Sequence, residues 1–346
     1  MSPPARTGAR RWSTRSTGTG RESGRTMSIS KHSGQTIADI MPLLQCPTTG
    51  KTLVWDGKRR CTSEAADGQA IEYPVVNGQL VLVDFEESIL DRSETVTREA
   101  ASVIEDRPER KSFVKRILLG ENEVATKNAA LLLERIRVKG EESVVLIVCG
   151  GSINVGASDL YAADGVRIIA FDIYSSANTD FVADAHAIPL RDNSVDAVWI
   201  QAVLEHVLTP ATVADEIWRV LKPGGIVYAE TPFLQPVHEA GYDFTRFTES
   251  GHRRLFRKFD LIDCGVVRGP GTVLFQILRY ALGAAFGNRR LGSRIAAPFF
   301  WLRLFDRLAD SAHARDAASA TYFLGTRSDT RLRPRDMPGF HRGVRN

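Results

Sequence analysis

Two short stretches of this chain carry residue types that suit the binding of an adenosine-like group. A glycine-rich turn, with Gly150 and Gly151 at its centre, follows the apolar run Val144–Val148. Glycines at such a turn let a ligand approach the backbone N–H groups closely. The next apolar run ends in Asp172, where a carboxylate can accept hydrogen bonds from both hydroxyls of a ribose. A glycine turn alone also fits a tight strand-to-helix connection, so the acid one strand further on is the informative signal.

A second group of reactive side chains lies in the stretch ETPFLQPVHEAGYDFTRFTESG, residues 230–251. An imidazole accepts a proton near neutral pH, and we predict His238 to be the catalytic general base. Its polar neighbours in the sequence are Glu239, Tyr242, Asp243 and Arg246. The alternative is a structural lid, in which the aromatic side chains Tyr242, Phe244 and Phe247 pack and Asp243 pairs with Arg246.

Apolar runs alternate with a helical pattern around these residues. Four runs rich in β-branched residues are of the kind that a parallel sheet buries on both faces: Val144–Val148, Val166–Phe171, Val195–Ile200 and Ile226–Glu230. A helix is predicted before the last run. Thr209 is its N-cap, Pro210 is its first residue, and Pro223-Gly224-Gly225 ends it. The alternation predicts an α/β fold with a doubly wound, mostly parallel Rossmann-like sheet. Ligands bind beyond the carboxyl ends of such strands.

The stretch FVADAHAIPLRDNSVDAVWIQAVLEHVLTPATVADEIWRVLKPGGIVYAETPF resembles class I S-adenosylmethionine-dependent methyltransferases from their third to their fifth strand. The motifs D-A-x-x-L-P-x-x-D-x-S-x-D (with Ile188 at the leucine position), L-E-H-V and L-K-P-G-G occur in the family's order and spacing, and the resemblance covers about residues 142–270. It implies S-adenosylmethionine as the cofactor. By this resemblance Gly150 and Gly151 line its methionine part, Asp172 binds the ribose, Asp184 with Ala185 holds the adenine edge, and Gln201 faces the sulfonium.

The sequence departs from the family's first motif at two positions. Ile147 replaces the acid that usually stands two residues before the first glycine, and Cys149 replaces that glycine. The acid helps to position the cofactor's amino group, so its loss is expected to weaken binding. The remaining glycines keep the turn permissive, and we expect that cofactor binding is retained.

The histidines of the matched region receive different predicted roles. A related set of bacterial methyltransferases has a similar stretch, P-F-x-Q-x-x-H … Y-D-F-x-R-F-T, on which His238, Asp243 and Arg246 fall. His206, in L-E-H-V, is predicted to bond local backbone groups near the cofactor. His186 is predicted to be structural.

Residues 41–84 show short apolar stretches separated by turn signals, which is typical of small hairpins. This stretch resembles the small zinc-ribbon family that activates methyltransferases or is fused to them. The first ligand positions hold Cys46 and Cys61, and the second hold Thr49 (or Thr48) and Glu64. Two thiolates do not complete a tetrahedral zinc site, so no bound metal is expected; a mixed site with Glu64 or Asp67 is the alternative.

Helical segments flank the predicted sheet on both sides in the sequence. The windows Thr95–Ile104 and Glu123–Val138 predict two helices that link the β module to the sheet. Val273–Phe286 and Ile295–Leu308 are strongly apolar helical segments interrupted by arginines, and they predict a helical cap over the substrate side. The alternative is an interfacial surface for lipid-linked substrates, because apolar faces with flanking arginines suit anionic headgroups.

Composition and charge exclude several classes of protein. The chain has 346 residues, 43% hydrophobic and 25% charged, as globular proteins do. Its basic excess lies in residues 1–32 and 326–346, and the 293 residues between them carry a net charge of −6, which argues against a nucleic-acid partner. Four cysteines at unrelated spacings favour a reducing, cytoplasmic setting. The first thirty residues lack the apolar segment of a secretory signal, and Met27 is an alternative start.

These patterns divide the chain into six predicted segments. They are a disordered basic tail (1–38), a degenerate zinc-ribbon-like β module (39–87), a helical linker (88–140), the S-adenosylmethionine-binding core (141–270), a helical cap with the last strand (271–325) and a second basic tail (326–346).

The predicted function is the transfer of a methyl group from S-adenosylmethionine to an oxygen or nitrogen atom of a small-molecule, glycan or lipid-linked acceptor. Contact with the inner face of the membrane is part of the expectation. The alternatives are a catalytically silent binding or partner subunit, and a nicotinamide oxidoreductase, which the absence of G-x-G-x-x-G disfavours. Gln201-Ala202-Val203-Leu204 replaces the Asn-Pro-Pro-Tyr motif of enzymes that methylate adenine or glutamine amides, so amino-methylation of DNA is disfavoured.

Overall fold

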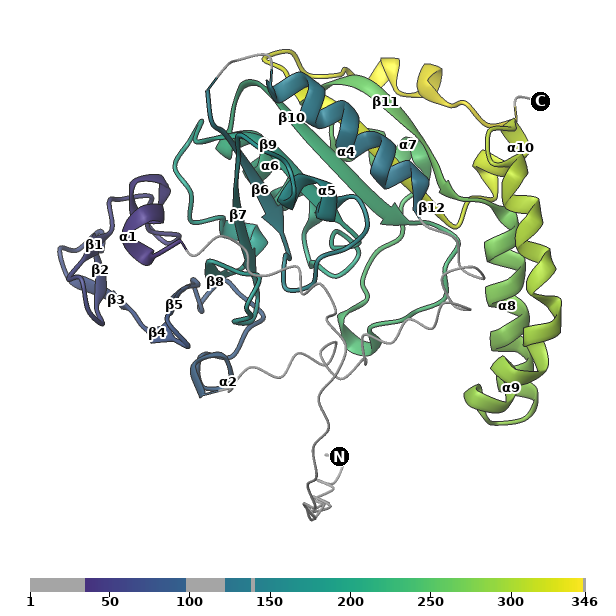
Figure 1. Cartoon of the computed structure of the whole chain (residues 1–346), viewed down its shortest axis with the longest axis horizontal. Helices are drawn as coiled ribbons and strands as arrows, with labels where there is room; N and C mark the ends of the chain where they lie inside the picture. The colour runs from purple at the N-terminus through teal and green to yellow at the C-terminus, as the bar shows by residue number, and fades with distance from the viewer. Residues whose placement is uncertain (1–34, 98–121, 138–140, 345–346) are drawn as a thin grey trace, which may run out of the picture. The chain divides into compact units, whose positions relative to one another are not determined.

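The computed structural model describes residues 35–97, 122–137 and 141–344, and within them nine strands form one sheet (Figure 1). Its order is β11-β12-β10-β9-β6-β7-β8-β5-β4. The strands are β4 (Val75–Val76), β5 (Gln79–Leu82), β6 (Ser143–Val148), β7 (Val166–Asp172), β8 (Phe181–Ala183), β9 (Val195–Gln201), β10 (Leu221–Pro232), β11 (Phe259–Arg268) and β12 (Ala320–Arg327). The six strands from β10 to β5 in this order run parallel to one another, whereas β4 pairs antiparallel with β5 and β12 runs antiparallel between β10 and β11. The predicted doubly wound, mostly parallel sheet is confirmed.

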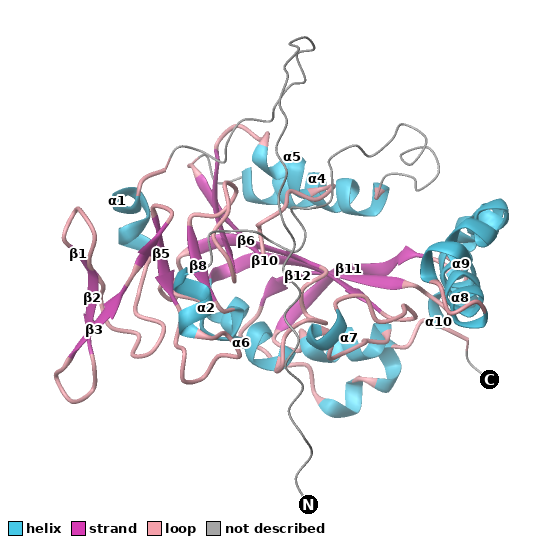
Figure 2. Cartoon of the chain, turned by 90° about the horizontal axis from the view of Figure 1, so that it is seen from below, coloured by secondary structure: helices cyan, strands magenta, loops and turns pink. Residues whose placement is uncertain are grey.

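Helices cover both faces of this sheet (Figure 2). On one face lie α4 (Glu123–Ile136) and α5 (Ala157–Tyr161), and on the other lie α6 (Pro210–Val220) and α7 (Glu249–Leu255). Two buried apolar clusters separate the layers, one on each face. Helix α6 begins after Thr209 as predicted, although the Thr209 side chain makes no cap hydrogen bond. It ends at Val220, before the Pro-Gly-Gly sequence, because Leu221 is already extended and pairs with Val195 of β9.

The strand order reverses beside β6, which lies between β7 and β9. In such sheets a crevice forms at the carboxyl ends of the strands that flank the reversal. The Gly150-Gly151 turn follows β6, Asp172 ends β7 and Gln201 ends β9, so all three lie at this edge.

The N-terminal residues form two structures instead of one separate module. A three-stranded sheet contains β1 (Val54–Trp55), β2 (Cys61–Glu64) and β3 (Ala70–Tyr73), while β4 and β5 extend the main sheet. Strand β5 pairs in parallel with β8, and its Leu80 and Leu82 are fully buried. Backbone pairing with β5 occupies the edge of β8, which would otherwise be open to pairing with another chain. The preceding α1 (Ile37–Ile40) and η1 (Met41–Leu43), and the following α2 (Arg92–Thr97), complete this part.

Several predicted segments lie wholly or partly outside the described residues, namely most of the tail 1–38 and, in the linker, 98–121 and 138–140. Helix α4 is the second predicted linker helix. Residues 326–344 of the predicted basic tail lie within the described part of the chain. Arg327 lies 3.9 Å from the centre of the Trp218 ring, and Leu332 N–H donates to the Arg257 carbonyl over 2.8 Å, so aromatic and backbone contacts hold this basic segment on the domain.

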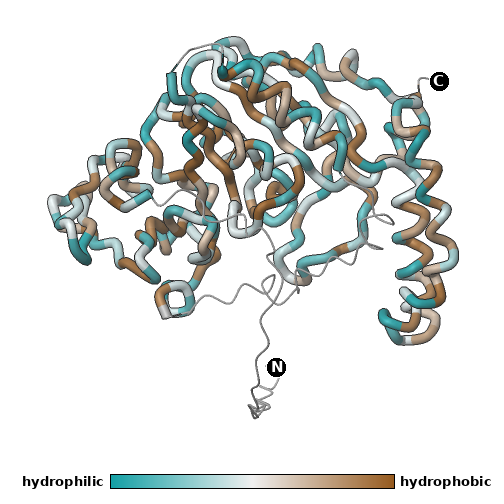
Figure 3. The backbone as a smooth tube through the Cα atoms, viewed as in Figure 1, coloured by the Kyte–Doolittle hydropathy of each residue, from teal (hydrophilic) through white to brown (hydrophobic). Residues whose placement is uncertain are grey.

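The predicted helical cap is a helical hairpin made of α8 (Pro270–Ala285), α9 (Arg289–Ala296) and the 3-10 helix η5 (Ala297–Leu308), followed by α10 (Ala312–Asp316). It packs mainly on itself: in α8 only Gly271 and Thr272 are buried, and no residue of η5 is. Large apolar side chains therefore stay exposed. They include Leu274, Ile277, Trp301, Leu304, Phe305 and Leu308. Figure 3 shows brown, hydrophobic segments along this hairpin. Across the described residues, every helix is too short or too polar to cross a membrane.

Candidate active site

The turn after β6 keeps the backbone geometry of a glycine turn although its first glycine is missing. Cys149 has φ +56°, a left-handed conformation that favours glycine and costs a side-chain-bearing residue about 1–2 kcal/mol. Gly150 N–H donates to the Phe171 carbonyl over 2.9 Å, which ties the turn to β7. A Cβ atom on Gly151 would lie 2.4 Å from the Tyr174 hydroxyl and 2.7 Å from Asp172 Oδ2. A side chain at position 151 would therefore displace the Tyr174 hydroxyl and the Asp172 carboxylate from their present positions.

Asp172 lies at the end of β7 with its carboxylate against this turn. Gly151 N–H donates to Oδ2 over 2.9 Å and Ile173 N–H donates to Oδ1 over 2.7 Å. Burial raises the pKa of Asp172 to about 6, although the two N–H groups act to lower it. The pairing of turn and acid that the sequence predicted is thus present, with lone pairs left on each oxygen for a ligand.

Asp184, the predicted adenine contact, is N-cap of the short 3-10 helix η3 (Ala185–Ala187), and Ala185 is buried beside it. Its Oδ1 accepts the backbone N–H of His186 over 2.9 Å and lies 2.6 Å from His186 Nδ1. Ser88 Oγ donates to Oδ2. Burial raises the pKa of Asp184, but these hydrogen bonds outweigh it and lower that pKa overall. His186 Nε2 also accepts Thr209 N–H over 3.1 Å, as expected of a structural histidine.

Gln201, the predicted sulfonium neighbour, belongs to a polar network at the ends of β9 and β10. Its amide donates to Glu230 Oε2 over 2.8 Å, and Asn122 Nδ2 donates to Glu230 Oε1 over 3.0 Å. Tyr228 also donates to Glu230. Burial raises the pKa of Glu230, and the three donors satisfy its carboxylate. Sequence reasoning missed Glu230 and Asn122, because only the parallel register places Glu230 beside Gln201.

The segment after β10, residues 233–248, contains the predicted base. The Asp243 carboxylate accepts hydrogen bonds from the His238 backbone N–H, over 2.9 Å, and from both Nη atoms of Arg246. The hydrogen bond from Arg246 lowers the pKa of Asp243 to about 2. Asp243 Oδ2 also lies 3.4 Å from His238 Nδ1. The predicted Asp243–Arg246 pair is therefore present. Tyr242 and Phe244 are 60% and 41% exposed, whereas Phe247 packs against the buried apolar cluster. One of the three aromatic side chains therefore packs as the alternative interpretation expected.

The loop after β9 is bonded to this segment through Glu205 and His206. The Glu205 carbonyl accepts N–H groups from Phe244 and Thr245, and His206 Nδ1 lies 2.8 Å from the Tyr242 carbonyl. His206 therefore bonds to a backbone group, as predicted, but to one 36 residues away in the sequence and not to local backbone. Burial raises the pKa of the Glu205 carboxyl to about 8 and lowers the pKa of His206. The base role of His238 stays a prediction, since these contacts give its position and not its reaction.

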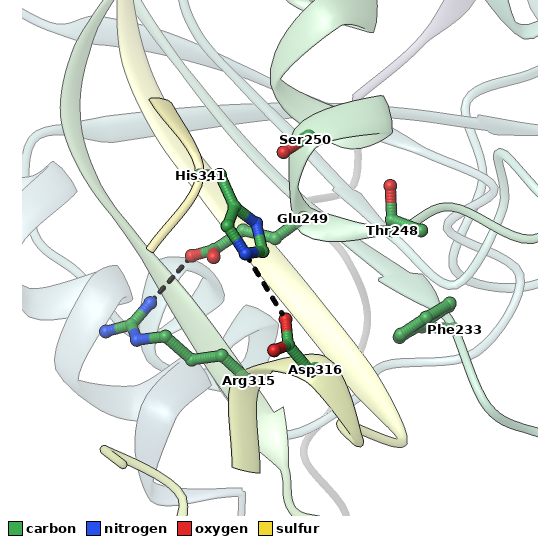
Figure 4. A pocket seen from close by; sticks show the side chains of 7 residues that line it. All are labelled: Phe233, Thr248, Glu249, Ser250, Arg315, Asp316 and His341. Carbon is green, nitrogen blue, oxygen red and sulfur yellow. Dashed lines mark hydrogen bonds and ion pairs between the residues drawn. The ribbon is translucent and has the colours of Figure 1, made fainter. Parts of the chain in front are cut away.

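Two further groups of side chains contain none of the predicted site residues. A pocket near α7 and α10 is lined by Phe233, Thr248, Glu249, Ser250, Arg315, Asp316 and His341 (Figure 4). Its charged groups pair with one another, as Arg315 does with Glu249 over 2.6 Å. In the N-terminal region Cys46 and Cys61 are both buried, and Cys46 Sγ lies 3.0 Å from the Tyr73 hydroxyl. The resemblance to a zinc ribbon stays a prediction.

Comparison with known proteins places residues 149–229 in the family described as methyltransferase domain. Demethylmenaquinone methyltransferase of Clavibacter sepedonicus is 38% identical over 103 residues, which are 25% of this chain and 42% of the relative. Malonyl-[acyl-carrier protein] O-methyltransferase of Enterobacter lignolyticus is 22% identical over 179 residues, which are 49% of this chain and 70% of the relative. The chain spans less than half of the length of three curated relatives that it matches, namely 35%, 42% and 45%.

Among solved structures, 1,6-didemethyltoxoflavin-N1-methyltransferase of Burkholderia thailandensis is similar with a TM-score of 0.38 and 14% identity, over 80% of this chain and 99% of that chain. The sheet order and the polar groups at its carboxyl edge define a Rossmann-like α/β domain. The matched segment contains the turn after β6, Asp172, Asp184 and Gln201. Residues 149–229 therefore resemble a methyltransferase domain in sequence, and the sheet that contains them has a Rossmann-like order.

Proposed function

We propose that this chain transfers a methyl group from S-adenosylmethionine to an oxygen or nitrogen atom of a small-molecule, glycan or lipid-linked acceptor. The observation that carries the proposal is the contact between Gly151 N–H and the Asp172 carboxylate at the reversal of the strand order. Gly150, Gly151 and Asp172 would hold the methionine and ribose parts, and Asp184 with Ala185 would hold the adenine. His238 would activate the acceptor on the far side of the sulfonium, near Gln201.

The chemistry assigned to the chain's own residues is alignment and activation. Methyl transfer is an in-line displacement, so the protein must hold the acceptor atom behind the sulfonium methyl and exclude water. The loops after β9 and β10 are bonded to each other beside the predicted cofactor residues, which supports an acceptor site between them.

Isothermal titration of the full chain with S-adenosylmethionine and S-adenosylhomocysteine tests the proposal. Binding of both at one site per chain is the expected result. A measurement of acceptor turnover then distinguishes an enzyme from a catalytically silent partner subunit. The silent subunit is the alternative because Ile147 and Cys149 depart from the family's first motif. Absence of binding to either compound would overturn the proposed function.

The affinity for S-adenosylhomocysteine is expected to fall below about pH 6. Burial raises the pKa of Asp172 to about 6, and a ribose that donates two hydrogen bonds prefers the ionised carboxylate. Affinity should thus be constant above pH 7 and weaken by up to about tenfold per pH unit below pH 6, where the free protein is protonated. Titrations from pH 5 to 8 measure it. Asp172→Asn should remove this pH dependence, and an equally steep fall in that variant would assign it to another group.

The exposed apolar hairpin supports an acceptor presented at a membrane. Arg289, Arg290 and Arg294 of α9 are exposed close in sequence to the apolar side chains of η5, a combination that suits anionic headgroups. The full chain should therefore sediment with phosphatidylglycerol-containing vesicles and not with purely phosphatidylcholine vesicles. Trp301→Ser with Leu304→Ser should abolish sedimentation without changing cofactor affinity. Failure of the parent chain to sediment would remove the membrane from the proposal.

A further inference from the structure

Three side chains with metal-binding atoms converge where the loops after β9 and β10 meet. They are Glu205, His206 and His238, and one ligand atom from each lies within 4.8 Å of the others. His206 Nε2 lies 3.6 Å from Glu205 Oε1, and His238 Nε2 lies 4.0 Å from the same oxygen. Among the described residues this is the one group of three or more such side chains.

Both imidazoles are oriented through their other ring nitrogen. His206 Nδ1 lies 2.8 Å from the Tyr242 carbonyl, which only accepts hydrogen bonds, so Nδ1 carries the proton and Nε2 keeps its lone pair. His238 Nδ1 lies 3.4 Å from Asp243 Oδ2 and 3.5 Å from Arg246 Nη2, which can only donate. Metal-bound histidines regularly have a carbonyl or carboxylate at the second nitrogen, because that contact fixes the tautomer and the ring orientation. Both histidines have such an oxygen near Nδ1, and their Nε2 atoms lie 3.6 and 4.0 Å from Glu205 Oε1.

The Glu205 carboxylate lacks the partners that a buried carboxylate requires. Glu205 is 0% exposed, and within the described part of the chain neither carboxylate oxygen has a hydrogen-bond partner. Buried polar groups in folded proteins are almost always satisfied by a hydrogen bond or by coordination to a metal. Asp243 and Glu230 add negative charge near it and Arg246 adds one positive charge. A bound cation would supply the partner that the Glu205 carboxylate lacks.

We propose that Glu205, His206 and His238 bind one divalent first-row transition-metal ion. Metal–ligand bonds of about 2.1 Å in a tetrahedron place ligand atoms about 3.4 Å apart, so the observed 3.6 and 4.0 Å need shifts of well under 1 Å. Two imidazoles and one carboxylate are a set that suits zinc, iron or manganese and leaves coordination positions open.

The role of the metal ion rests on the proposed function, methyl transfer to an acceptor. An acceptor hydroxyl bound at an open position would lose its proton to water more easily, because the ion stabilises the resulting oxyanion. The oxygen would then form the bond to the methyl carbon while the carbon–sulfur bond breaks, with its electron pair remaining on sulfur in S-adenosylhomocysteine. His238 would be a ligand in this arrangement, and the ion would supply the activation predicted for a free base.

Metal titration of the full chain tests the proposal. Protein stripped with a chelator and dialysed is titrated calorimetrically with Zn²⁺ and with Mn²⁺, and Co²⁺ loading is followed by visible absorption. One site per chain is expected for at least one of these ions. Glu205→Gln and His206→Asn should each lower the affinity for that ion by at least tenfold. Melting temperatures measured in parallel show whether each variant is folded. His313→Gln, an exposed histidine elsewhere, and the double variant Cys46→Ser/Cys61→Ser should bind as the parent does.

Each other outcome contradicts the proposal. Parent protein that binds none of the three ions stoichiometrically overturns it, as does unchanged affinity in folded Glu205→Gln. Loss of binding in the double cysteine variant alone would place the metal in the N-terminal region. Titration with S-adenosylmethionine on the same samples separates the two proposals: cofactor binding without metal leaves the proposed function standing, and metal binding without cofactor leaves only the metal site.

Discussion

Replacing His238 with Gln is expected to lower turnover by about 10²–10⁴-fold while the affinity for S-adenosylmethionine changes little. The imidazole lies between Asp243 Oδ2, 3.4 Å from Nδ1, and Glu205 Oε1, 4.0 Å from Nε2. A glutamine keeps a similar size and hydrogen bonds, but its amide provides no basic nitrogen towards Glu205. Steady-state turnover of an acceptor, with cofactor affinity measured by titration, checks the expectation.

Val237→Ala is the matched control for this variant. Val237 is the neighbouring residue and is 59% exposed, so truncating it perturbs the same segment without touching the histidine. Its turnover should stay within a few-fold of the parent. If His238→Gln behaves in the same way, the acceptor is activated elsewhere and His238 only stabilises the segment.

Asp172→Ala should weaken the binding of S-adenosylhomocysteine by about 1.5–3 kcal/mol, the value typical of lost charge-assisted hydrogen bonds. That is a factor of about 10–150 in the dissociation constant. The carboxylate already accepts Gly151 N–H and Ile173 N–H at the end of β7, which holds it where a ribose would reach both oxygens. Calorimetric titration gives the affinity, and circular dichroism shows whether the fold is retained.

Asp164→Ala serves as the control, because this exposed residue lies before the amino end of the same strand. It should bind as the parent does. Equal affinities for Asp172→Ala, Asp164→Ala and the parent would remove Asp172 from the cofactor site.

The parallel strands could be predicted because their residue pattern reports burial on both faces. Each of the four runs became a strand within a few residues of its predicted bounds. Strand β11 was missed, since Asp260 and Asp263 interrupt its apolar residues and it pairs only with the later strand β12. The joining of β5 to β8 was missed for a related reason, as a four-residue strand shows nothing of its distant partner.

The candidate site, like the sheet, contains residues that local sequence could predict and residues that depend on contacts between distant segments. Gly150, Gly151 and Asp172 could be predicted because a turn and the next strand end bring them together locally, and the structure keeps them in contact. The L-E-H-V motif marked His206, but a short motif does not show that both Glu205 oxygens lack partners or that His238 faces them. That arrangement depends on three hydrogen bonds between two loops that lie far apart in the sequence.

The pairing of β5 with β8 ties the order of folding to the direction of synthesis. Leu80 and Phe181 are neighbours in the sheet, yet a loop of roughly a hundred residues must close before they meet. On the ribosome the N-terminal strand emerges well before its partner, so its apolar side chains must wait in an unpaired state. The sheet can complete this edge only after β6, β7 and β8 exist, which makes the pairing a late and slow step.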